Sequence, residues 1–513
     1  MAFTKSVAEI VAEDRTGLLG KHPTWERVRL GEVAAVLNGY PFDSANFNSE
    51  QGMPLARIRD VLPGRTATYY SGAFDADFVI HSGDLLVGMD GDFNSAHWAS
   101  SPALLNQRVC KITTNEKFYD KQFLSLLLPG YLSAINANTP SITVKHLSSK
   151  TINDILLPLP PRAEQQRIAE KADELLSDLD AGVAELKAAQ QKLKAFRQSL
   201  LKAAVEGDLT AAWRAKNKPI ETGTQLLERI LTERRARWEA RQLAKFEAQG
   251  KRPPKDWQGK YPAPVLPDTA ELPGLPNGWR WSSLGECFQI VVGATPSRKE
   301  KSYWNGTVPW VSSGEVRFNR IRSTKERITP TGLSNSSTQI NPIGSVLLGM
   351  IGEGKTRGQV AIIDIPAANN QNCAAIWVSE SPAPPEFVYY WLWSRYEETR
   401  RGSSGNNQPA LNKFTVERIP LPLPPLTEMQ EIVRAIDVSM EQIARQESAV
   451  ESLLRQIEVQ RQNILQAAFA GELVPQDSSD EPASVLLDRI RNERKKGTAK
   501  PRTTQKTALT VSA

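Results

Sequence analysis

Cysteine, histidine and long hydrophobic runs are all scarce in this chain of 513 residues. The three cysteines, Cys110, Cys287 and Cys373, lie far apart without a C-x-x-C pair, and the four histidines form no cluster with metal-ligand spacing. These absences argue against a disulfide framework and against a metal site. Because no run of eighteen apolar residues occurs and acidic residues interrupt the N-terminal segment, we expect a cytoplasmic protein with no membrane contact.

Length and charge narrow the class of protein further. A chain of this length is longer than a domain with a single hydrophobic core usually is. The length therefore indicates two to four domains. The net charge of +6 and the pI of about 9.0 suit a nucleic-acid partner, although many unrelated proteins share them. Charge alone therefore assigns no function.

The chain contains the same pattern twice. "TINDILLPLPPRAEQQRI" (151–168) matches "TVERIPLPLPPLTEMQEI" (415–432) at a shift of 415 − 151 = 264 residues, and "LLKAAVEGDL" (200–209) matches "ILQAAFAGEL" (464–473) at the same shift. Shorter anchors recur in the same order: W-x4-L-G-E at Trp25 and Trp279, G-M-x-G at Gly88 and Gly349, Asn-Gln at Asn106 and Asn370, and L-P-L-P-P at Leu157 and Leu421. So many anchors in one order indicate a duplicated unit.

Each copy begins with a globular stretch of mixed α and β character. Short alternating runs predict strands, and two longer apolar runs predict helices. The predicted strands are "ARIRDV" (56–61), "GDLLVGM" (83–89), "QRVCKI" (107–112), "SVLLGM" (345–350) and "QVAIIDI" (359–365); the predicted helices are "FLSLLL" (123–128) and "FVYYWLW" (387–393).

Each copy then continues into a long helix that carries a heptad stripe. The apolar stripe consists of Ala172, Leu179, Leu186, Leu193 and Leu200 in the first copy, and of Ile436, Ile443, Val450, Ile457 and Ile464 in the second. The prolines of L-P-L-P-P suit the helix starts, and Gly207 and Gly471 suit the ends, so each helix has about forty residues and a length of roughly 60 Å. A single stripe could pack on any core, but two matched stripes favour mutual, antiparallel packing as a fixed spacer.

The predicted fold class is α+β, with two mixed α/β domains related by pseudo-two-fold symmetry and joined by two long antiparallel coiled-coil helices. The predicted segments are an N-terminal segment (1–21), a first recognition domain (22–157), a central spacer helix (158–209), a basic helical segment with a proline-rich linker (210–275), a second recognition domain (276–421), a distal spacer helix (422–473), a charged helix (474–500) and a disordered tail (501–513).

One stretch, "GMIGEGKT" (349–356), fits the phosphate-loop pattern G-x-x-x-x-G-K-[ST]. A phosphate loop must be followed by a helix whose N-terminus holds the phosphates, but here the β-branched run "QVAIIDI" follows almost at once. The equivalent turn of the first copy also lacks Gly-Lys-Thr. We therefore predict a hairpin turn whose Lys355, Thr356 and Arg357 could reach a DNA phosphate or a guanine edge, whereas Asp90, Asp92, Asn94 and Ser95 occupy the turn of the first copy. Solvated turns without a special role remain an alternative.

In this order, and twice over, the anchors resemble the DNA-specificity subunit of type I restriction-modification enzymes across roughly residues 22 to 495. The resemblance implies a non-catalytic reader of a split, asymmetric DNA target, with one domain on each half. It also implies double-stranded DNA, two methyltransferase subunits and restriction motor-nuclease subunits as partners, which would supply S-adenosylmethionine, ATP and Mg, while this chain holds no cofactor and no metal.

Other sequence features agree with a reader that catalyses nothing itself. No N-P-P-[YF] or D-P-P-[YF] methyltransferase motif occurs, and the E-x-K of Glu353 and Lys355 lacks the upstream Pro-Asp of a nuclease. Two alternatives stay open, a coiled-coil scaffold with two binding modules for something other than DNA, and a phosphate-loop ATPase. The basic segment 210–260 could line DNA, lie in solvent or dock a methyltransferase subunit.

Polar and aromatic residues on predicted loops and strand ends are the candidate DNA contacts, although each of them could also be merely solvated. In the first domain they are Arg57, Arg59, Tyr69, Tyr70, Asn94, Arg108 and Lys145; in the second they are Ser312, Arg317, Lys355, Arg357, Asn406, Asn407 and Gln408. Because acids and bases are about equally frequent in the first domain, its phosphate contacts should be few, clustered or supplemented by partners.

Overall fold

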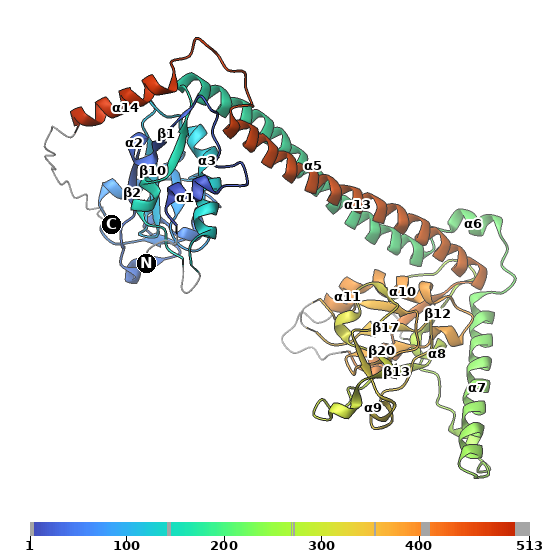
Figure 1. The fold of residues 1–513 in the computed structure, drawn as a ribbon. Helices are drawn as coiled ribbons and strands as arrows, with labels where there is room; N and C mark the ends of the chain where they lie inside the picture. The colour runs from blue at the N-terminus through green and yellow to red at the C-terminus, as the bar shows by residue number, and fades with distance from the viewer. Residues whose placement is uncertain are drawn as a thin grey trace. The chain divides into compact units, whose positions relative to one another are not determined.

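The computed structural model describes residues 5–140, 145–267, 269, 272–352, 355–401 and 411–497, without the side chains of 401 and 497. The chain forms two compact units. Unit 1 consists of Met1–Lys187 with Glu451–Ala513, and unit 2 consists of Ala188–Val450. Unit 1 therefore combines the beginning and the end of the chain. The predicted fold class, two repeated α/β domains with long helices, is confirmed (Figure 1).

Unit 1 contains a four-stranded antiparallel sheet in the order β2-β10-β7-β8, a five-stranded sheet in the order β3-β5-β4-β9-β6, and the pair β1-β11. Its strands are β1 (Glu26–Arg29), β2 (Ala34–Asn38), β3 (Phe47–Asn48), β4 (Met53–Ala56), β5 (Tyr69–Tyr70), β6 (Val79–Ile80), β7 (Leu85–Gly88), β8 (Ser95–His97), β9 (Ala103–Leu105), β10 (Val109–Thr114) and β11 (Leu156–Leu159). Its helices are α1 (Val7–Ala12), α2 (Leu30–Val33), α3 (Lys121–Ala137), α4 (Ser149–Asn153) and α14 (Ala483–Gly497), with 3-10 turns η1 (Ser44–Asn46), η2 (Ile58–Asp60) and η3 (Ala76–Phe78).

Unit 2 contains a five-stranded sheet in the order β13-β20-β17-β18-β15, a three-stranded sheet in the order β16-β14-β19, and the pair β12-β21. Its strands are β12 (Arg280–Ser283), β13 (Ile290–Val292), β14 (Trp304–Val311), β15 (Asn319–Ile321), β16 (Glu326–Ile328), β17 (Val346–Gly349), β18 (Val360–Ile363), β19 (Ala368–Asn369), β20 (Cys373–Ile376) and β21 (Pro420–Leu423). Its helices are α6 (Ala211–Lys216), α7 (Gly223–Ala248), α8 (Leu284–Cys287), α9 (Pro330–Ser334), α10 (Pro385–Ser394), α11 (Tyr396–Arg401) and α12 (Lys413–Glu417), with 3-10 turns η4 (Trp257–Lys260), η5 (Lys301–Tyr303), η6 (Ser313–Glu315) and η7 (Val378–Glu380).

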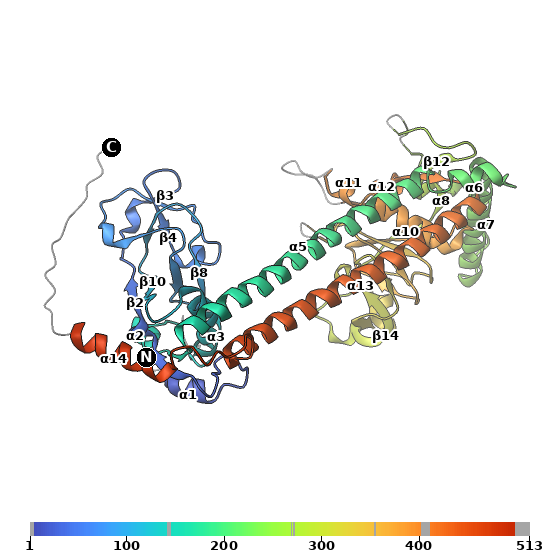
Figure 2. The ribbon, with the colours of Figure 1, turned by 90° about the horizontal axis from the view of Figure 1, so that it is seen from above.

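Two helices of 45 residues, α5 (Arg162–Glu206) and α13 (Leu426–Ala470), run side by side (Figure 2). In unit 1, Arg461 of α13 forms an ion pair with Asp180 of α5. In unit 2, Arg197 of α5 donates to Glu447 of α13 over 2.6 Å. Also in unit 1, a Cβ on Gly182 would lie 3.8 Å from Ile457, so residue numbers rise along α5 as they fall along α13 and the pairing there is antiparallel. Every residue of the predicted heptad stripes is buried or half-buried.

The helix ends agree with the sequence signals. Each long helix begins directly after a proline pair and stops before Gly207 or Gly471. Both glycines have positive φ, 84° and 74°, which is the left-handed conformation that closes a helix at its C-terminus. One strand prediction is wrong, because residues 58–60 of "ARIRDV" form the turn η2. There the Asp60 carboxylate accepts a 3.0 Å hydrogen bond from the Arg57 backbone N–H and closes the turn.

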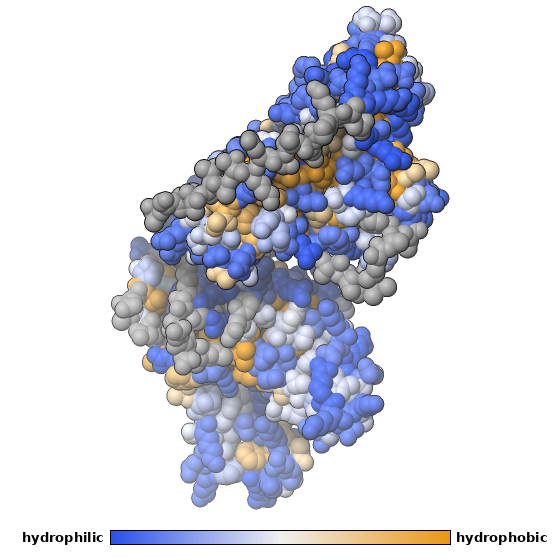
Figure 3. All heavy atoms as spheres, turned by 90° about the vertical axis from the view of Figure 1, so that its left-hand side faces the viewer, coloured by the Kyte–Doolittle hydropathy of each residue, from blue (hydrophilic) through white to orange (hydrophobic). Residues whose placement is uncertain are grey.

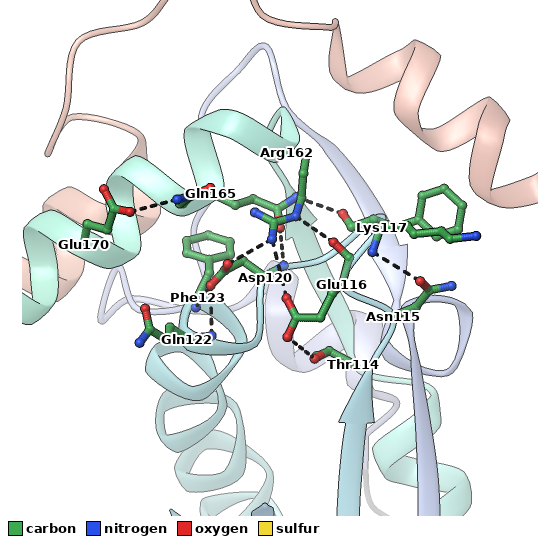
Figure 4. Close-up of polar contacts among 12 residues, drawn as sticks. Thr114, Asn115, Glu116, Lys117, Asp120, Gln122, Phe123, Arg162, Gln165 and Glu170 are labelled. Atoms are coloured by element: carbon green, nitrogen blue, oxygen red, sulfur yellow. Dashed lines mark hydrogen bonds and ion pairs between the residues drawn. The ribbon is translucent and has the colours of Figure 1, made fainter. Parts of the chain in front are cut away.

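A polar clamp joins the start of α5 to the start of α3 (Figure 4). The Asp120 carboxylate caps α3 by accepting hydrogen bonds from the backbone N–H groups of Gln122 and Phe123, and it lies 3.1 Å from the Arg162 guanidinium. The side-chain oxygen of Gln165 accepts a 2.8 Å hydrogen bond from the Asp120 backbone N–H. The first turn of α5 is therefore fixed to the domain by charge-assisted contacts.

The apolar cores lie between the sheets and the helices of each unit. In unit 1, one cluster joins Val87 of β7 and Phe123 of α3 with Phe469 of α13 and Leu486 and Ile490 of α14. Hydrophilic residues cover most of the face drawn in Figure 3, and hydrophobic residues form smaller patches on it. Each helix in the described part of the chain is too short or too polar to cross a bilayer.

Candidate nucleic-acid interface

Four of the predicted contact residues in unit 1 gather around the end of β7. The Asp90 carboxylate, just after β7, lies 3.0 Å from the Arg108 guanidinium and 2.7 Å from Nδ1 of His146. The backbone N–H of Gly91 donates to the carbonyl of Lys145 over 3.0 Å. The β7–β8 turn is thus tied to the segments that carry Arg108 and Lys145.

Asn94 and Arg57 join the same region from two other segments. A Cβ placed on Gly88 would lie 2.7 Å from Oδ1 of Asn94 and 3.1 Å from Ile58, so both segments press on the last residue of β7. Arg57 donates to the Thr68 hydroxyl over 2.8 Å. A larger residue at position 88 would therefore displace the Asn94 side chain.

The neighbouring Arg59 is exposed and partly paired. Its guanidinium lies 4.0 Å from the Asp60 carboxylate and 3.4 Å from the Thr68 hydroxyl. Burial raises the pKa of Asp60, while a hydrogen bond from Thr66 and the charge of Arg59 act in the opposite direction. Arg59 is therefore available on its outer face for a phosphate contact.

The two predicted tyrosine contacts differ in exposure. Tyr69 of β5 is half-buried, whereas Tyr70 is buried with its ring centroid 4.9 Å from that of Phe42 and 6.2 Å from that of Phe47. Tyr70 is thus a core residue of the five-stranded sheet, and its ring offers no contact surface. The prediction of Tyr70 as a DNA contact is therefore wrong. Aromatic residues on a short strand pack inward when the sheet has an apolar face.

The β17–β18 turn carries two candidate contacts of unit 2. Leu348 of β17 pairs with Val360 of β18 in an antiparallel register, so the segment between them is a hairpin connection and leads into a strand. A phosphate loop requires a helix at this point. Lys355 is exposed, and its carbonyl accepts a 2.9 Å hydrogen bond from the Tyr396 hydroxyl of α11. The backbone of Lys355 is therefore held by α11. A strand follows the turn, where a nucleotide site would need a helix.

Arg317 lies at the same end of the sheet as Arg357. β15 runs parallel to β18 with Asn319 opposite Ala361, so the residues that precede these two strands meet at one edge. Arg317 is exposed, and its guanidinium donates to the carbonyl of Gly314 over 2.5 Å. Ser312 instead caps η6 through its contact with Glu315 and is half-buried.

Several predicted features fall in segments that the structure does not describe. Asn406, Asn407 and Gln408 lie outside the described residues, as do Glu353 of the E-x-K and the tail 501–513. Sequence reasoning also missed the cations that follow Arg317, namely Arg320, Arg322, Lys325 and Arg327. The signal was the charge density, because residues 317–327 contain five cations and one acid.

The basic segment 210–260 contains thirteen cations and six acids, and several of its arginines are paired with neighbouring groups. In α7, Arg229 pairs with Glu221 and Arg237 with Glu233, while Arg234 donates to backbone carbonyls at Gly285 and Glu286 of α8. Unit 1 has a similar contact, because Arg494 of α14 lies 3.2 Å from Glu32 of α2. These arginines therefore fasten α7 and α14 to their domains.

The described residues contain no group of three or more His, Cys, Asp or Glu side chains arranged to hold a metal ion. Burial raises the pKa of Cys110, Cys287 and Cys373 to about 12 in each case. Thiols with such a pKa stay protonated at neutral pH and make poor nucleophiles. The side chains that gather at the two turns are instead suited to hydrogen bonding with phosphates and base edges.

Comparisons with known proteins agree with this geometry. The family model of the type I restriction modification DNA specificity domain matches residues 23–194 and 276–451. The chain is 35% identical to the specificity subunit of the Escherichia coli type I restriction enzyme EcoBI, over 96% of this chain and 97% of the relative. It is 25% identical to the EcoDI specificity subunit of Escherichia coli, over 93% and 96%.

A solved structure shares the fold. It comes from work on complex assembly and conformational transition of the type I R-M system, and it matches with a TM-score of 0.59 at 20% identity. The match covers 88% of this chain and 98% of that one. The duplicated arrangement of domains and long helices is therefore present in an independent structure.

Proposed function

Because the chain belongs to the family of type I restriction-modification DNA specificity subunits, we propose that it reads a split, asymmetric DNA target with one α/β domain on each half. The chain itself carries out no catalytic step in this proposal. Two methyltransferase subunits dock on it and supply S-adenosylmethionine, and restriction subunits supply the ATP- and Mg-dependent motor and nuclease. The proposal places the assembly in the cytoplasm, where the DNA is.

The observation that carries the proposal is the pairing of one scaffold with two different turns. The hairpin after β7 carries Asp90, which is paired with Arg108 and His146, and Asn94, whereas the corresponding hairpin after β17 carries Lys355 and Arg357. Carboxylate and amide groups prefer cytosine N4 and adenine edges, while Lys and Arg prefer guanine O6 and N7. The two domains repeat the same strands but carry different residues on these hairpins. This difference supports the proposal that the two half-sites differ in base sequence.

The antiparallel helices α5 and α13 supply the spacer in this proposal. Their apolar stripes keep heptad spacing through both units, and heptad packing fixes the register of two helices. Adding seven residues to both helices, after Gly182 and before Ile457, should lengthen each by about 10 Å. The expected result is a wider gap between two unchanged half-sites in the methylated motif.

The proposal is tested by single-molecule sequencing of N6-methyladenine in host DNA, with the gene intact and deleted. The expected outcome is the loss of one split motif on deletion. An unchanged methylome, in a host that expresses the methyltransferase partner, would instead support a coiled-coil scaffold for a ligand other than DNA.

A domain exchange tests the division of the target. Replacing residues 22–157 by those of a relative should change one half-site and leave the other intact. If both half-sites change, the domains do not read independently and the modular proposal fails.

A further inference from the structure

The edge of the larger sheet in unit 2 carries a cationic strip. It consists of Arg317, Arg320, Arg322, Lys325 and Arg327, which lie before, on and after the edge strand β15, and we call it the β15 strip. All five residues are exposed. Only the start of the strip, at Arg317, lies at the end of the sheet where the β17–β18 turn carries Lys355 and Arg357.

Nearby carboxylates neutralise the strip only in part. Arg320 donates to Asp364 over 2.7 Å and to Glu386 over 2.8 Å, and its hydrogen bond to Asp364 lowers the pKa of that carboxyl group. Arg322 lies 3.3 Å from the same Asp364, but its side chain is 78% exposed. Arg320 is therefore held in place, and Arg322 projects into solvent.

Other acidic residues near the strip have different partners. Glu326 pairs with Arg298, and Glu315 accepts hydrogen bonds from Ser312 and from the Lys325 backbone N–H. The Lys325 side chain thus keeps its charge for an external anion, and Arg322 keeps part of its charge because it shares the Asp364 carboxylate with Arg320.

The surface around Arg322 is hollowed on both sides. A hollow of about 440 Å³ is lined by Arg317, Arg322 and Lys325, and a second of about 410 Å³ has Arg322 and Arg327 beside a mostly apolar lining that includes Val308, Ile340 and Ile365. A cation between two hollows can reach an anionic group that enters either of them. The exposed cations follow one another along and beside β15. A nucleic-acid backbone carries anions at regular intervals along a line, so it fits this row better than a single small anion does.

The first domain lacks an equivalent strip among its candidate contacts. Its four candidate cations come from three separate segments: Arg57 donates to Thr68, Arg59 lies 4.0 Å from Asp60, Arg108 lies 3.0 Å from Asp90, and Lys145 donates to Asn136. Electrostatic attraction to phosphates should therefore be unequal between the two domains.

We propose that the β15 strip binds the phosphates of one DNA strand beside the half-site read by the second domain, and that it contributes to this chain's salt-dependent affinity. The inference rests on the proposed function and extends it by naming the backbone contacts. In this arrangement Arg320 positions the strip through Asp364 and Glu386, and Arg317, Arg322 and Lys325 contact phosphates.

The test uses the full-length chain in complex with its methyltransferase subunits and compares Arg322→Gln/Lys325→Gln with the wild type. Binding to target duplex and to scrambled duplex is measured across salt concentrations. Loss of two phosphate contacts should make the slope of log K against log salt less negative by up to about 1.8, and should weaken binding to both duplexes by the same factor. The matched control, Arg434→Gln/Arg445→Gln, removes two exposed arginines of α13 that pair with Glu431 and Glu441 and should leave the slope unchanged.

Two outcomes would overturn the proposal. One is a slope of log K against log salt in the variant that equals the wild-type slope. The strip would then serve only to keep the edge strand β15 from pairing with another molecule. The other is weaker binding to the target duplex alone, which would make these residues base readers. The wild-type complex reports separately on the proposed function, because equal affinity for target and scrambled DNA would refute sequence reading whatever the slope.

Discussion

The indole N–H of Trp25 donates a 3.0 Å hydrogen bond to the carboxylate of Glu164, which lies 139 residues further along the chain. Unit 2 repeats the contact, with Trp279 donating to Glu428 over 2.9 Å. The other partners differ, because Glu164 accepts from Gln476, whereas Glu428 accepts from Thr210 and from the guanidinium of Arg214. Each contact fastens the first turn of a long helix to its domain, but only the second contains a cation.

This difference predicts unequal effects of removing the indole N–H. Trp25→Phe should lower the free energy of unfolding by about 1–3 kcal/mol, because a buried carboxylate loses one of its donors. Trp279→Phe should cost less, since Arg214 and Thr210 continue to satisfy Glu428. Urea unfolding followed by circular dichroism measures both, with the half-buried Trp257→Phe as the control for ring size. Equal losses at the two sites would contradict the role given to Arg214.

The buried Glu164 also predicts a pH dependence. Burial raises its pKa, against the effects of hydrogen bonds from Gln476 and Trp25. The folded state therefore binds the proton more tightly than the unfolded state, so this carboxyl lowers stability as pH rises from about 4.3 through the raised pKa. Glu164→Gln removes the titration, and its stability relative to the wild type should improve between pH 4 and pH 7.

The measurement is the free energy of unfolding at several pH values, with the exposed Glu451→Gln as the control for loss of one charge. A constant difference between Glu164→Gln and the wild type across this range would show that Glu164 does not titrate within it.

The glycine that ends each long helix should resist substitution. Gly471 has a φ of 74°, and a Cβ there would lie 2.8 Å from both Trp25 and His22. Gly471→Ala should therefore cost about 1–3 kcal/mol of unfolding free energy through backbone strain and overlap. Gly259→Ala is the matched control, because that position has open space around it. A Gly471→Ala variant as stable as Gly259→Ala would show that the helix end adjusts without strain.

The polar clamp of unit 1 predicts a graded series at Asp120. Asp120→Ala removes both the cap of α3 and the ion pair with Arg162, and should cost about 2 kcal/mol. Asp120→Asn keeps a capping oxygen and should cost less. Thermal unfolding of these variants, alone and combined with Arg162→Gln, measures the coupling between the two residues. Additive losses would show that the ion pair contributes nothing.

The long helices were predictable from sequence, whereas the contact surface was not. Proline pairs and glycines are local signals, so α5 begins and ends where the sequence indicates. By contrast, the alternation in "ARIRDV" predicts a strand, but the Asp60 side chain closes a turn there. The cations of the β15 strip are visible in the sequence as a dense local charge, but no pattern near Arg320 shows that the distant Asp364 and Glu386 will pair with it.

Unit 1 draws its apolar core from both ends of the chain, since Phe469, Leu486 and Ile490 pack with residues of the first domain. A ribosome that has finished residue 187 has not yet made any of these three side chains. The domain that is translated first is therefore completed last, while unit 2, a continuous stretch from Ala188 to Val450, can close its core earlier. During synthesis the first domain must keep an unfinished apolar surface until the C-terminal helix emerges.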